Sequence, residues 1–185
     1  MPNGESSYRR FLSGDDNGIV EIVREYKDGL ILYLNSFVRN LTVAEELCED
    51  AFVKLAVRKP HFREGSSFKT FLYAVGRNTA LDYLRKNRGN VVAIEELSET
   101  LRDDRESLEQ SYIREERKIA VHRAMETLKS EYRQVLWLTY FEGLSNKETA
   151  AVMRKSVHNI ETLVYRARNA LKTALEKEGF EYEQL

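Results

Sequence analysis

The sequence predicts an all-α fold made of two small helical domains. Proline interrupts helices most strongly, and it occurs only twice in 185 residues, at Pro2 and Pro60. Apolar residues make up 42% of the chain and recur at steps of three and four along several segments, as on one face of an α-helix. The charges nearly balance at a net −1, but they are sorted into blocks, which indicates separate surfaces for separate partners.

The N-terminal part begins with an amphipathic helix, or two consecutive ones, predicted over residues 19–41. Asp15 or Asp16 is expected to cap its start, because a carboxylate accepts from the free N–H groups of a first turn. The next helix is expected to follow Thr42 as its N-cap and to end before Pro60. Residues 15–50 carry nine acidic residues against three basic ones, and the net charge of −1 makes the protein as a whole a poor binder of polyanions.

A basic segment follows, with nine basic residues against two acidic ones over residues 54–90. Gly65 and its serine neighbours predict a loop, and a long helix is expected over residues 68–86. On this helix Lys69, Tyr73 and Arg77 line up at steps of four. Cations interleaved with an aromatic ring suit single-stranded nucleic acid. The alternative is a solvated face with a half-buried tyrosine.

Residues 91–112 predict a linker, because they are polar, acidic and only weakly periodic. Nine acidic residues stand against three basic ones over residues 91–116. The domain boundary is placed here, which gives an N-terminal domain over residues 1–90 and a C-terminal domain over residues 113–185.

Four helices are predicted beyond the linker. The first spans residues 113–128, and Ser130 is expected to cap a second that ends at Gly143. Ser145 and Glu148 form the S-x-x-E pattern of a capping box, which starts a third helix ending near Met153. A break at residues 154–156 then precedes a final helix to about residue 177.

The last two helices fit a helix-turn-helix, with the small Ala150 at their inner crossing. Spacing alone leaves an ordinary helical hairpin almost equally open. The DNA-binding interpretation is favoured by a polar and basic face, to which Glu161 adds one opposing charge. That face is formed by Asn159, Thr162, Tyr165, Arg166 and Asn169, with Arg168 and Lys172 placed for phosphates.

The residues argue against an enzyme. The three histidines are scattered, metal-ligand spacing and glycine-rich nucleotide motifs are absent from the sequence, and no cofactor is expected. The lone Cys48 cannot form an internal disulfide. With no long apolar run and no signal peptide, we expect a cytoplasmic protein without membrane insertion. Two further alternatives are a stand-alone helix-turn-helix regulator, whose residues 1–90 would dimerise or bind a ligand, and a helical scaffold.

Two segments resemble extracytoplasmic-function (ECF) sigma factors, the smallest members of the sigma-70 family of bacterial transcription initiation factors. Residues 66–85 read SSFKTFLYAVGRNTALDYLR and resemble the family's promoter minus-ten segment, usually SFxxWLYxIAxNxAxDxLR. Residues 141–171 are similar to the family's C-terminal helix-turn-helix, which binds the minus-thirty-five element. The resemblance spans most of the chain and implies a region 2-like domain, an acidic linker and a region 4-like domain.

The resemblance implies a factor that binds core RNA polymerase, directs it to promoters and assists DNA melting. The acidic segment 44–52 would dock on the β′ clamp helices through Glu46, Glu49 and Asp50, and the β flap would be a second polymerase contact. An anti-sigma factor is a further implied partner, which could hold the protein at the membrane.

The same resemblance implies contacts with promoter DNA, both duplex and single-stranded. Those to the minus-ten element are Phe62, Arg63, Lys69, Tyr73, Arg77, Asn78 and Arg85, with Asn78 beside the pocket for a base flipped out of the strand. Those to the minus-thirty-five element are Lys155, Ser156, Asn159, Thr162, Tyr165, Arg166 and Arg168.

The sequence departs from the family pattern at several positions. Phe71 replaces the usual tryptophan of the first motif, and Arg154 replaces the usual glycine of the helix-turn-helix turn. Glu161 and Leu163 stand where lysine and arginine are common. These exchanges do not change the fold assignment. Because of them, no base contact is inferred for Glu161 or Leu163, and the bases of the promoter are not predicted.

Overall fold

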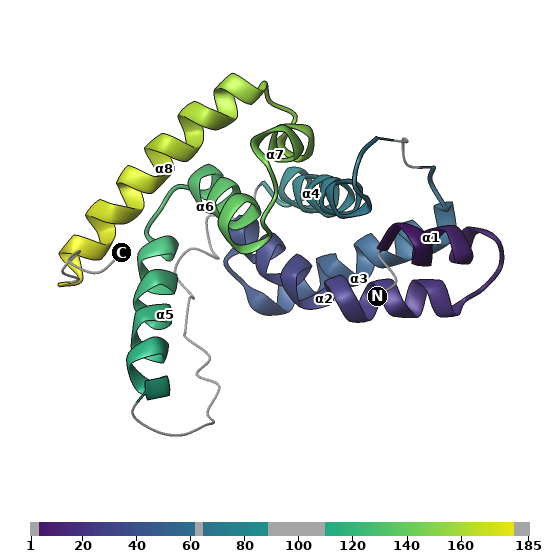
Figure 1. The fold of residues 1–185 in the computed structure, drawn as a ribbon, viewed down its shortest axis with the longest axis horizontal. Coiled ribbons are helices and arrows are strands. Elements are labelled where there is room, and N and C mark those ends of the chain that lie inside the picture. Colours follow the sequence, from purple (N-terminus) through teal and green to yellow (C-terminus); the bar gives the residue numbers. More distant parts are fainter. Residues whose placement is uncertain (1–3, 62–64, 89–109, 180–185) are drawn as a thin grey trace.

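The computed structural model describes residues 4–61, 65–88 and 110–179, and every regular element in these ranges is a helix (Figure 1). The all-α prediction is confirmed. The N-terminal elements are α1 (Gly4–Leu12), α2 (Asn17–Val38), α3 (Leu41–Arg58) and α4 (Phe68–Lys86). The C-terminal elements are α5 (Gln110–Glu126), α6 (Ser130–Leu136), the π-helical turn η2 (Trp137–Phe141), α7 (Asn146–Met153) and α8 (Val157–Lys177).

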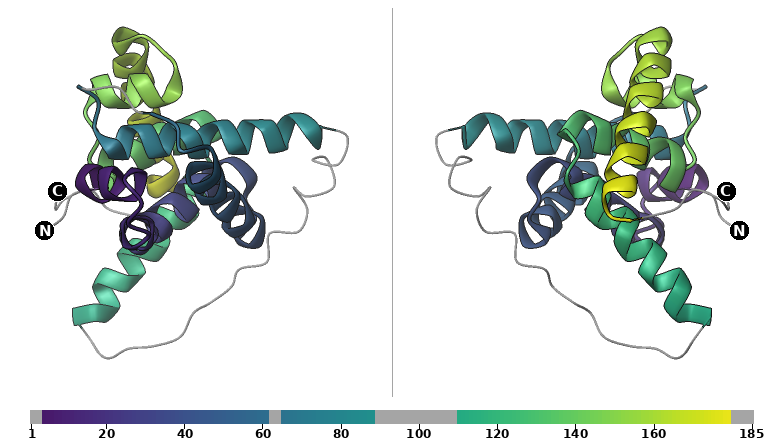
Figure 2. Two further views of the ribbon diagram at one scale, coloured as in Figure 1. Left: turned by 90° about the vertical axis from the view of Figure 1, so that its right-hand side faces the viewer. Right: turned by 90° about the vertical axis from the view of Figure 1, so that its left-hand side faces the viewer.

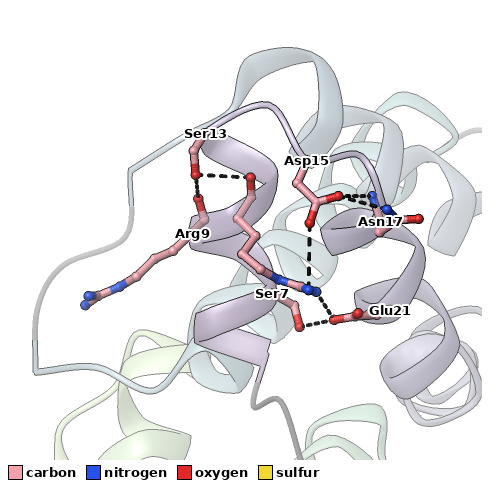
Figure 3. Close-up of polar contacts among 7 residues, drawn as sticks. Ser7, Arg9, Ser13, Asp15, Asn17 and Glu21 are labelled. Carbon is pink, nitrogen blue, oxygen red and sulfur yellow. Dashed lines mark hydrogen bonds and ion pairs between the residues drawn. The ribbon is translucent and has the colours of Figure 1, made fainter.

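Helix α1 was not predicted, and polar contacts fasten it to α2 (Figure 3). The Ser7 hydroxyl donates to the Glu21 carboxylate at 2.7 Å, and Arg10 forms an ion pair with the same carboxylate. These two partners hold the pKa of Glu21 below its ordinary value. A Cβ atom at Gly18 would lie 2.2 Å from the Ser7 carbonyl oxygen, so the close crossing of α1 and α2 requires glycine there.

The start of α2 uses one of the two predicted caps. Asp16 occupies the N-cap position without a side-chain bond, whereas Asp15 accepts from the Asn17 backbone N–H at 3.0 Å. The predicted cap of α3 is wrong. Asn40, rather than Thr42, accepts from the Val43 N–H at 3.1 Å.

The N-cap of α3 lies two residues before the predicted one because α2 ends at Val38. Arg39 adopts a left-handed conformation at φ 50°, which lets α3 begin at Leu41. At its other end α3 stops at Arg58, just before Pro60, as predicted.

Helix α4 spans the predicted residues and is capped by Ser67, whose hydroxyl accepts from the Thr70 N–H at 3.2 Å. Its apolar side packs on α2, where a Cβ atom at Gly76 would lie 2.7 Å from Leu30 Cδ1. The rings of Tyr8 and Phe68, 5.2 Å apart, join α1 to α4. These contacts make the four N-terminal helices one packed unit.

The C-terminal half differs from prediction at two helix starts. Helix α5 begins at Gln110, inside the range predicted as linker, and the rest of that range lies outside the described residues. Ser130 does not cap α6, because its hydroxyl donates instead to the Ser36 carbonyl oxygen at 3.1 Å. The helix predicted to end before Gly143 closes with the π-turn η2, and Gly143 follows at φ 68°.

The two halves of the chain pack against each other, with α6 on α2 and α7 beside the first part of α4 (Figures 1 and 2). Arg133 of α6 is 6% exposed and donates to the Ser36 carbonyl oxygen at 2.8 Å and to that of Leu128. Burial lowers the pKa of Arg133 to about 10. Among the described helices, none has the length and apolar character needed to cross a membrane.

Candidate nucleic-acid and polymerase interfaces

Helices α7 and α8 form the predicted helix-turn-helix. The Ser145 hydroxyl accepts from the Glu148 N–H at 3.2 Å, and the Glu148 carboxylate accepts from the Ser145 N–H at 2.9 Å, so the capping box is confirmed. Arg154 ends α7 in the left-handed region at φ 53°, a conformation that glycine adopts without the steric cost of a Cβ atom. Ser156 then caps α8 by accepting from the Asn159 N–H at 3.1 Å.

The inner side of the motif is apolar and tightly packed. Ala150 is 5% exposed, as predicted for the crossing, and Ile160, Leu163 and Ala167 of α8 are buried against the domain core. Leu163 is therefore a core residue.

The outer side of α8 is open to a partner. Asn159, Arg166 and Arg168 are exposed, and Tyr165 is 67% exposed. Thr162 is half-buried beside them. A long helix entered through a tight turn, with polar and cationic side chains on the outer side of its first half, can lie in the major groove.

The two predicted residues before α8 have structural partners as well. Lys155 forms an ion pair with Glu131 of α6 at 2.7 Å, and Ser156 is exposed while its hydroxyl caps α8. Lys155 is therefore not a free cation.

Lys69, Tyr73 and Arg77 lie on one face of α4, but none of these side chains is fully exposed. Tyr73 is wholly buried, its ring centroid 5.3 Å from that of Tyr33, and burial raises its pKa above the ordinary range. Lys69 is half-buried and contacts Glu142 of the C-terminal half at 2.8 Å. Arg77 is half-buried, and its Nε atom has no hydrogen-bond partner among the described residues. In this conformation the interleaved face cannot stack an unpaired base, which differs from the sequence expectation.

The other residues predicted for the minus-ten contact do not gather at one place in the structure. Asn78 is half-buried, and Arg85 is exposed and paired with Asp82 on the same helix. Phe62 and Arg63 lie outside the described residues.

The acidic side chains Glu46, Glu49 and Asp50 are all exposed on α3, so the structure brings them onto one accessible surface. Leu47, Cys48 and Ala51 face the core between them. Burial raises the pKa of the Cys48 thiol to about 12, and the described residues contain no group of side chains able to hold a metal ion.

Two family models match the chain, Sigma-70 region 2 over residues 22–89 and Sigma-70, region 4 over residues 118–171. The RNA polymerase sigma-H factor of Pseudomonas aeruginosa is 30% identical over 175 residues, which cover 90% of this chain and 91% of that protein. The chain belongs to the sigma-70 family. It is a sigma factor of the ECF type, which directs RNA polymerase to promoters.

Other proteins support this assignment. The ECF RNA polymerase sigma factor SigM of Bacillus subtilis is 29% identical over 154 residues, covering 83% of this chain and 93% of the relative. The fold is similar to that of the sigma factor RpoE from Bartonella quintana, solved in complex with the anti-sigma factor NepR. That match has a TM-score of 0.65 and 23% identity, and covers 84% of this chain and 97% of the other. Sigma factors are in general transcription initiation factors without enzymatic activity.

Two residues of this sigma factor were missed by sequence reasoning. The Lys54 ammonium group donates to the Thr79 hydroxyl at 3.1 Å and so ties the acidic helix α3 to α4, next to Asn78. Glu142 reaches across to Lys69, although in the sequence it marks only the last position before a helix-ending glycine. Both contacts join residues far apart in the chain, and no local pattern signals them.

Proposed function

We propose that this sigma factor recognises a two-part promoter, using α8 for the minus-thirty-five element and the basic side of α4 for the minus-ten element. The observation that carries the proposal is the exposed outer side of α8, with Asn159, Tyr165, Arg166 and Arg168 free of the domain core. Lys155, Ser156 and Thr162 complete this contact. Base edges would be read from α8 while its cations fix the register on phosphates.

The minus-ten contact is assigned to residues of α4 and the loop before it. Asn78 would contact an unstacked base, and capture of that base would offset part of the unstacking cost of melting. The contributing side chains are Phe62, Arg63, Lys69, Arg77, Asn78 and Arg85, whereas Tyr73, which is wholly buried, supports this face of α4 from the core.

Glu46, Glu49 and Asp50 are proposed to dock on the β′ clamp helices of core polymerase, and the C-terminal domain to contact the β flap. Exposed carboxylates on one helix favour a cationic partner surface and a fast encounter with it. We place the domain limits at residues 1–90 and 113–185, with an acidic linker between them. The protein acts in the cytoplasm, without chemistry of its own, and is restrained by an anti-sigma factor.

Promoter-dependent transcription in vitro tests the proposal. Purified core polymerase is supplied with the sigma factor and with fragmented DNA from the source genome, and start sites are mapped. Discrete starts that need both components support the proposal, and Arg166→Ala is expected to weaken them while Lys177→Ala, at the exposed end of α8, leaves them unchanged. DNA binding by the chain alone, without any polymerase-dependent starts, would instead support a stand-alone regulator.

The role of Asn78 has its own test. Asn78→Ala is expected to weaken promoter opening more than initial duplex binding, by about 1–3 kcal/mol if one base contact is lost. Permanganate reactivity of unpaired thymines measures opening, and a gel-shift assay measures duplex binding. Equal losses in both steps would make Asn78 a structural residue.

A further inference from the structure

Glu142 is one of the residues through which the C-terminal half contacts α4. Its side chain is only 11% exposed, and its carboxylate contacts the Lys69 ammonium group at 2.8 Å. The Glu142 backbone carbonyl accepts a second bond from the same ammonium group, also at 2.8 Å. The Trp137 indole N–H donates to the carboxylate at 3.2 Å and holds it in place from its own domain. Both acceptors of Glu142 are thus directed at one cation of the proposed DNA-binding helix.

A glycine in α2 makes room for this carboxylate. A Cβ atom at Gly29 would lie 2.6 Å from Glu142 Oε1 and 2.6 Å from the Tyr73 hydroxyl. Gly29 lies inside a 22-residue helix, where glycine is less favourable than alanine, and its backbone does not adopt a positive φ angle. The close approach of Glu142 and Tyr73 is therefore the structural reason for glycine at this position.

A second carboxylate from the C-terminal half contacts the start of α4. Glu148 of α7 accepts from the Ser67 hydroxyl at 3.1 Å and from the Thr70 hydroxyl at 3.5 Å. Together with the packing of α7 on α4, it places α7 over the first part of α4, as Figure 2 shows. Carboxylates therefore occupy the side of α4 that a nucleic-acid backbone would need.

Helices α4 and α7 each contain a buried polar atom without a partner in the described part of the chain. Arg77 Nε on α4 and the Thr149 hydroxyl on α7 are buried and form no hydrogen bond with any described residue. A buried donor that lacks an acceptor disfavours the conformation that buries it.

We propose that Glu142 is an intramolecular latch, which occupies Lys69 in place of nucleic acid and holds the free sigma factor closed. The inference rests on the proposed minus-ten role of α4. Closure and DNA binding at α4 oppose each other, because the Glu142 carboxylate repels a phosphate and Glu142 already takes up two of the three N–H donors of the ammonium group. The free chain then binds DNA weakly, and a partner that separates the two halves releases the α4 surface.

Two variants of the full chain test the latch, and neither adds a charged group. Glu142→Ala removes the carboxylate, and Gly29→Ala fills its position while favouring the α2 helix. Glu131→Ala is the matched control, because it makes the same charge change and breaks an ion pair of 2.7 Å that lies within the C-terminal half. Far-ultraviolet circular dichroism confirms that all three variants remain helical.

Small-angle scattering measures the separation of the halves, and hydrogen exchange measures the protection of α4. Affinity for a single-stranded oligonucleotide, without polymerase and at low salt, reports access to Lys69. Glu142→Ala and Gly29→Ala are expected to increase the radius of gyration, to deprotect α4 and to tighten oligonucleotide binding about tenfold, equivalent to about 1.4 kcal/mol. Glu131→Ala is expected to match the wild type in scattering and exchange.

The outcomes separate the latch from the proposed function. Unchanged scattering and exchange in both variants would overturn the latch, whatever the chain binds. Opening without tighter oligonucleotide binding would support the latch but contradict the DNA-binding role of α4. Opening of Glu131→Ala to the same extent would overturn the latch as well, because charge alone would then explain the change.

Discussion

The buried hydroxyl of Tyr33 offers a test of the packing in the N-terminal half. Tyr33 is fully buried, its ring packs at 5.3 Å from both Phe37 and Tyr73, and its hydroxyl has no hydrogen-bond partner among the described residues. Tyr33→Phe keeps the ring contacts and removes only the hydroxyl. A buried polar group without a partner costs about 1–3 kcal/mol, so this variant is expected to be more stable than the wild type.

The nearby Arg77 sets the gain at the lower end of that range. Burial raises the pKa of Tyr33, and the positive charge of Arg77 opposes that rise, which means that the hydroxyl oxygen lies in a favourable potential. We therefore expect a gain of about 1 kcal/mol. For a chain of this size, the gain raises the midpoint of thermal unfolding by roughly 2–4 °C.

Urea unfolding followed by circular dichroism, at constant m-value, measures the change in the free energy of unfolding. Tyr165→Phe is the control, because its ring is 67% exposed and its removal of a hydroxyl should fall within about 0.5 kcal/mol of the wild type. A loss of about 1 kcal/mol or more in Tyr33→Phe would refute the reasoning, since the hydroxyl would then have a partner worth more than its burial cost.

Three further changes probe contacts of the C-terminal half. Ser145→Ala removes the cap of α7 and should lower the free energy of unfolding by about 1 kcal/mol, measured by urea denaturation. Glu148 has a lowered pKa, because it accepts from the Ser145 N–H and from hydroxyl groups. The stabilisation by the Glu148 carboxylate is therefore complete above the unfolded pKa of about 4.3 and is lost as pH falls through the lower folded pKa. In thermal unfolding, Glu148→Gln should lack this stabilisation at every pH. Arg133→Met removes a charged donor from the carbonyl oxygens of Ser36 and Leu128, which keep Ser130 and Arg39 as their other donors, and should cost about 1–3 kcal/mol in calorimetry.

Each of these expectations has an outcome that contradicts it. Wild-type stability in Ser145→Ala would mean that another group satisfies the first turn of α7. A stability difference between Glu148→Gln and the wild type that persists unchanged at pH 2 would show that the carboxylate charge is not its source. Arg123→Met, a change at an exposed position of α5, is the control for Arg133→Met, and equal losses in the two variants would deny a special role to the buried guanidinium.

The helices that the sequence predicted well are those with strong local signals. Helices α4, α7 and α8 begin at a serine cap and have a clear apolar stripe, and both signals act within a few residues. Helix α1 escaped prediction because its nine residues depend on distant partners, above all the contact of Tyr8 with Phe68. The predicted caps Thr42 and Ser130 were wrong for the same reason. The left-handed Arg39 sets the start of α3, and the Ser130 hydroxyl donates to a carbonyl oxygen of α2 instead of capping α6.

The two candidate surfaces also differ in how far local sequence signals predict them. The outer side of α8 follows from helical periodicity alone, which also sends Leu163 inward. The basic side of α4 was predicted as a set of aligned residues, but its cover by Glu142 could not be predicted, because that contact spans the two halves of the chain. Sequence patterns thus predicted two candidate surfaces but gave no information on which of them is covered in the folded chain.

The burial of Cys48 makes the one thiol of the sequence unreactive in the folded protein. The thiol is 1% exposed and its pKa is raised to about 12, so at neutral pH almost none of it is the reactive thiolate. Thiol-directed dyes should leave it untouched in the native protein and modify it only when the N-terminal bundle unfolds. Pairs of cysteines introduced on the surfaces of the two halves can then carry fluorophores without removal of the native residue.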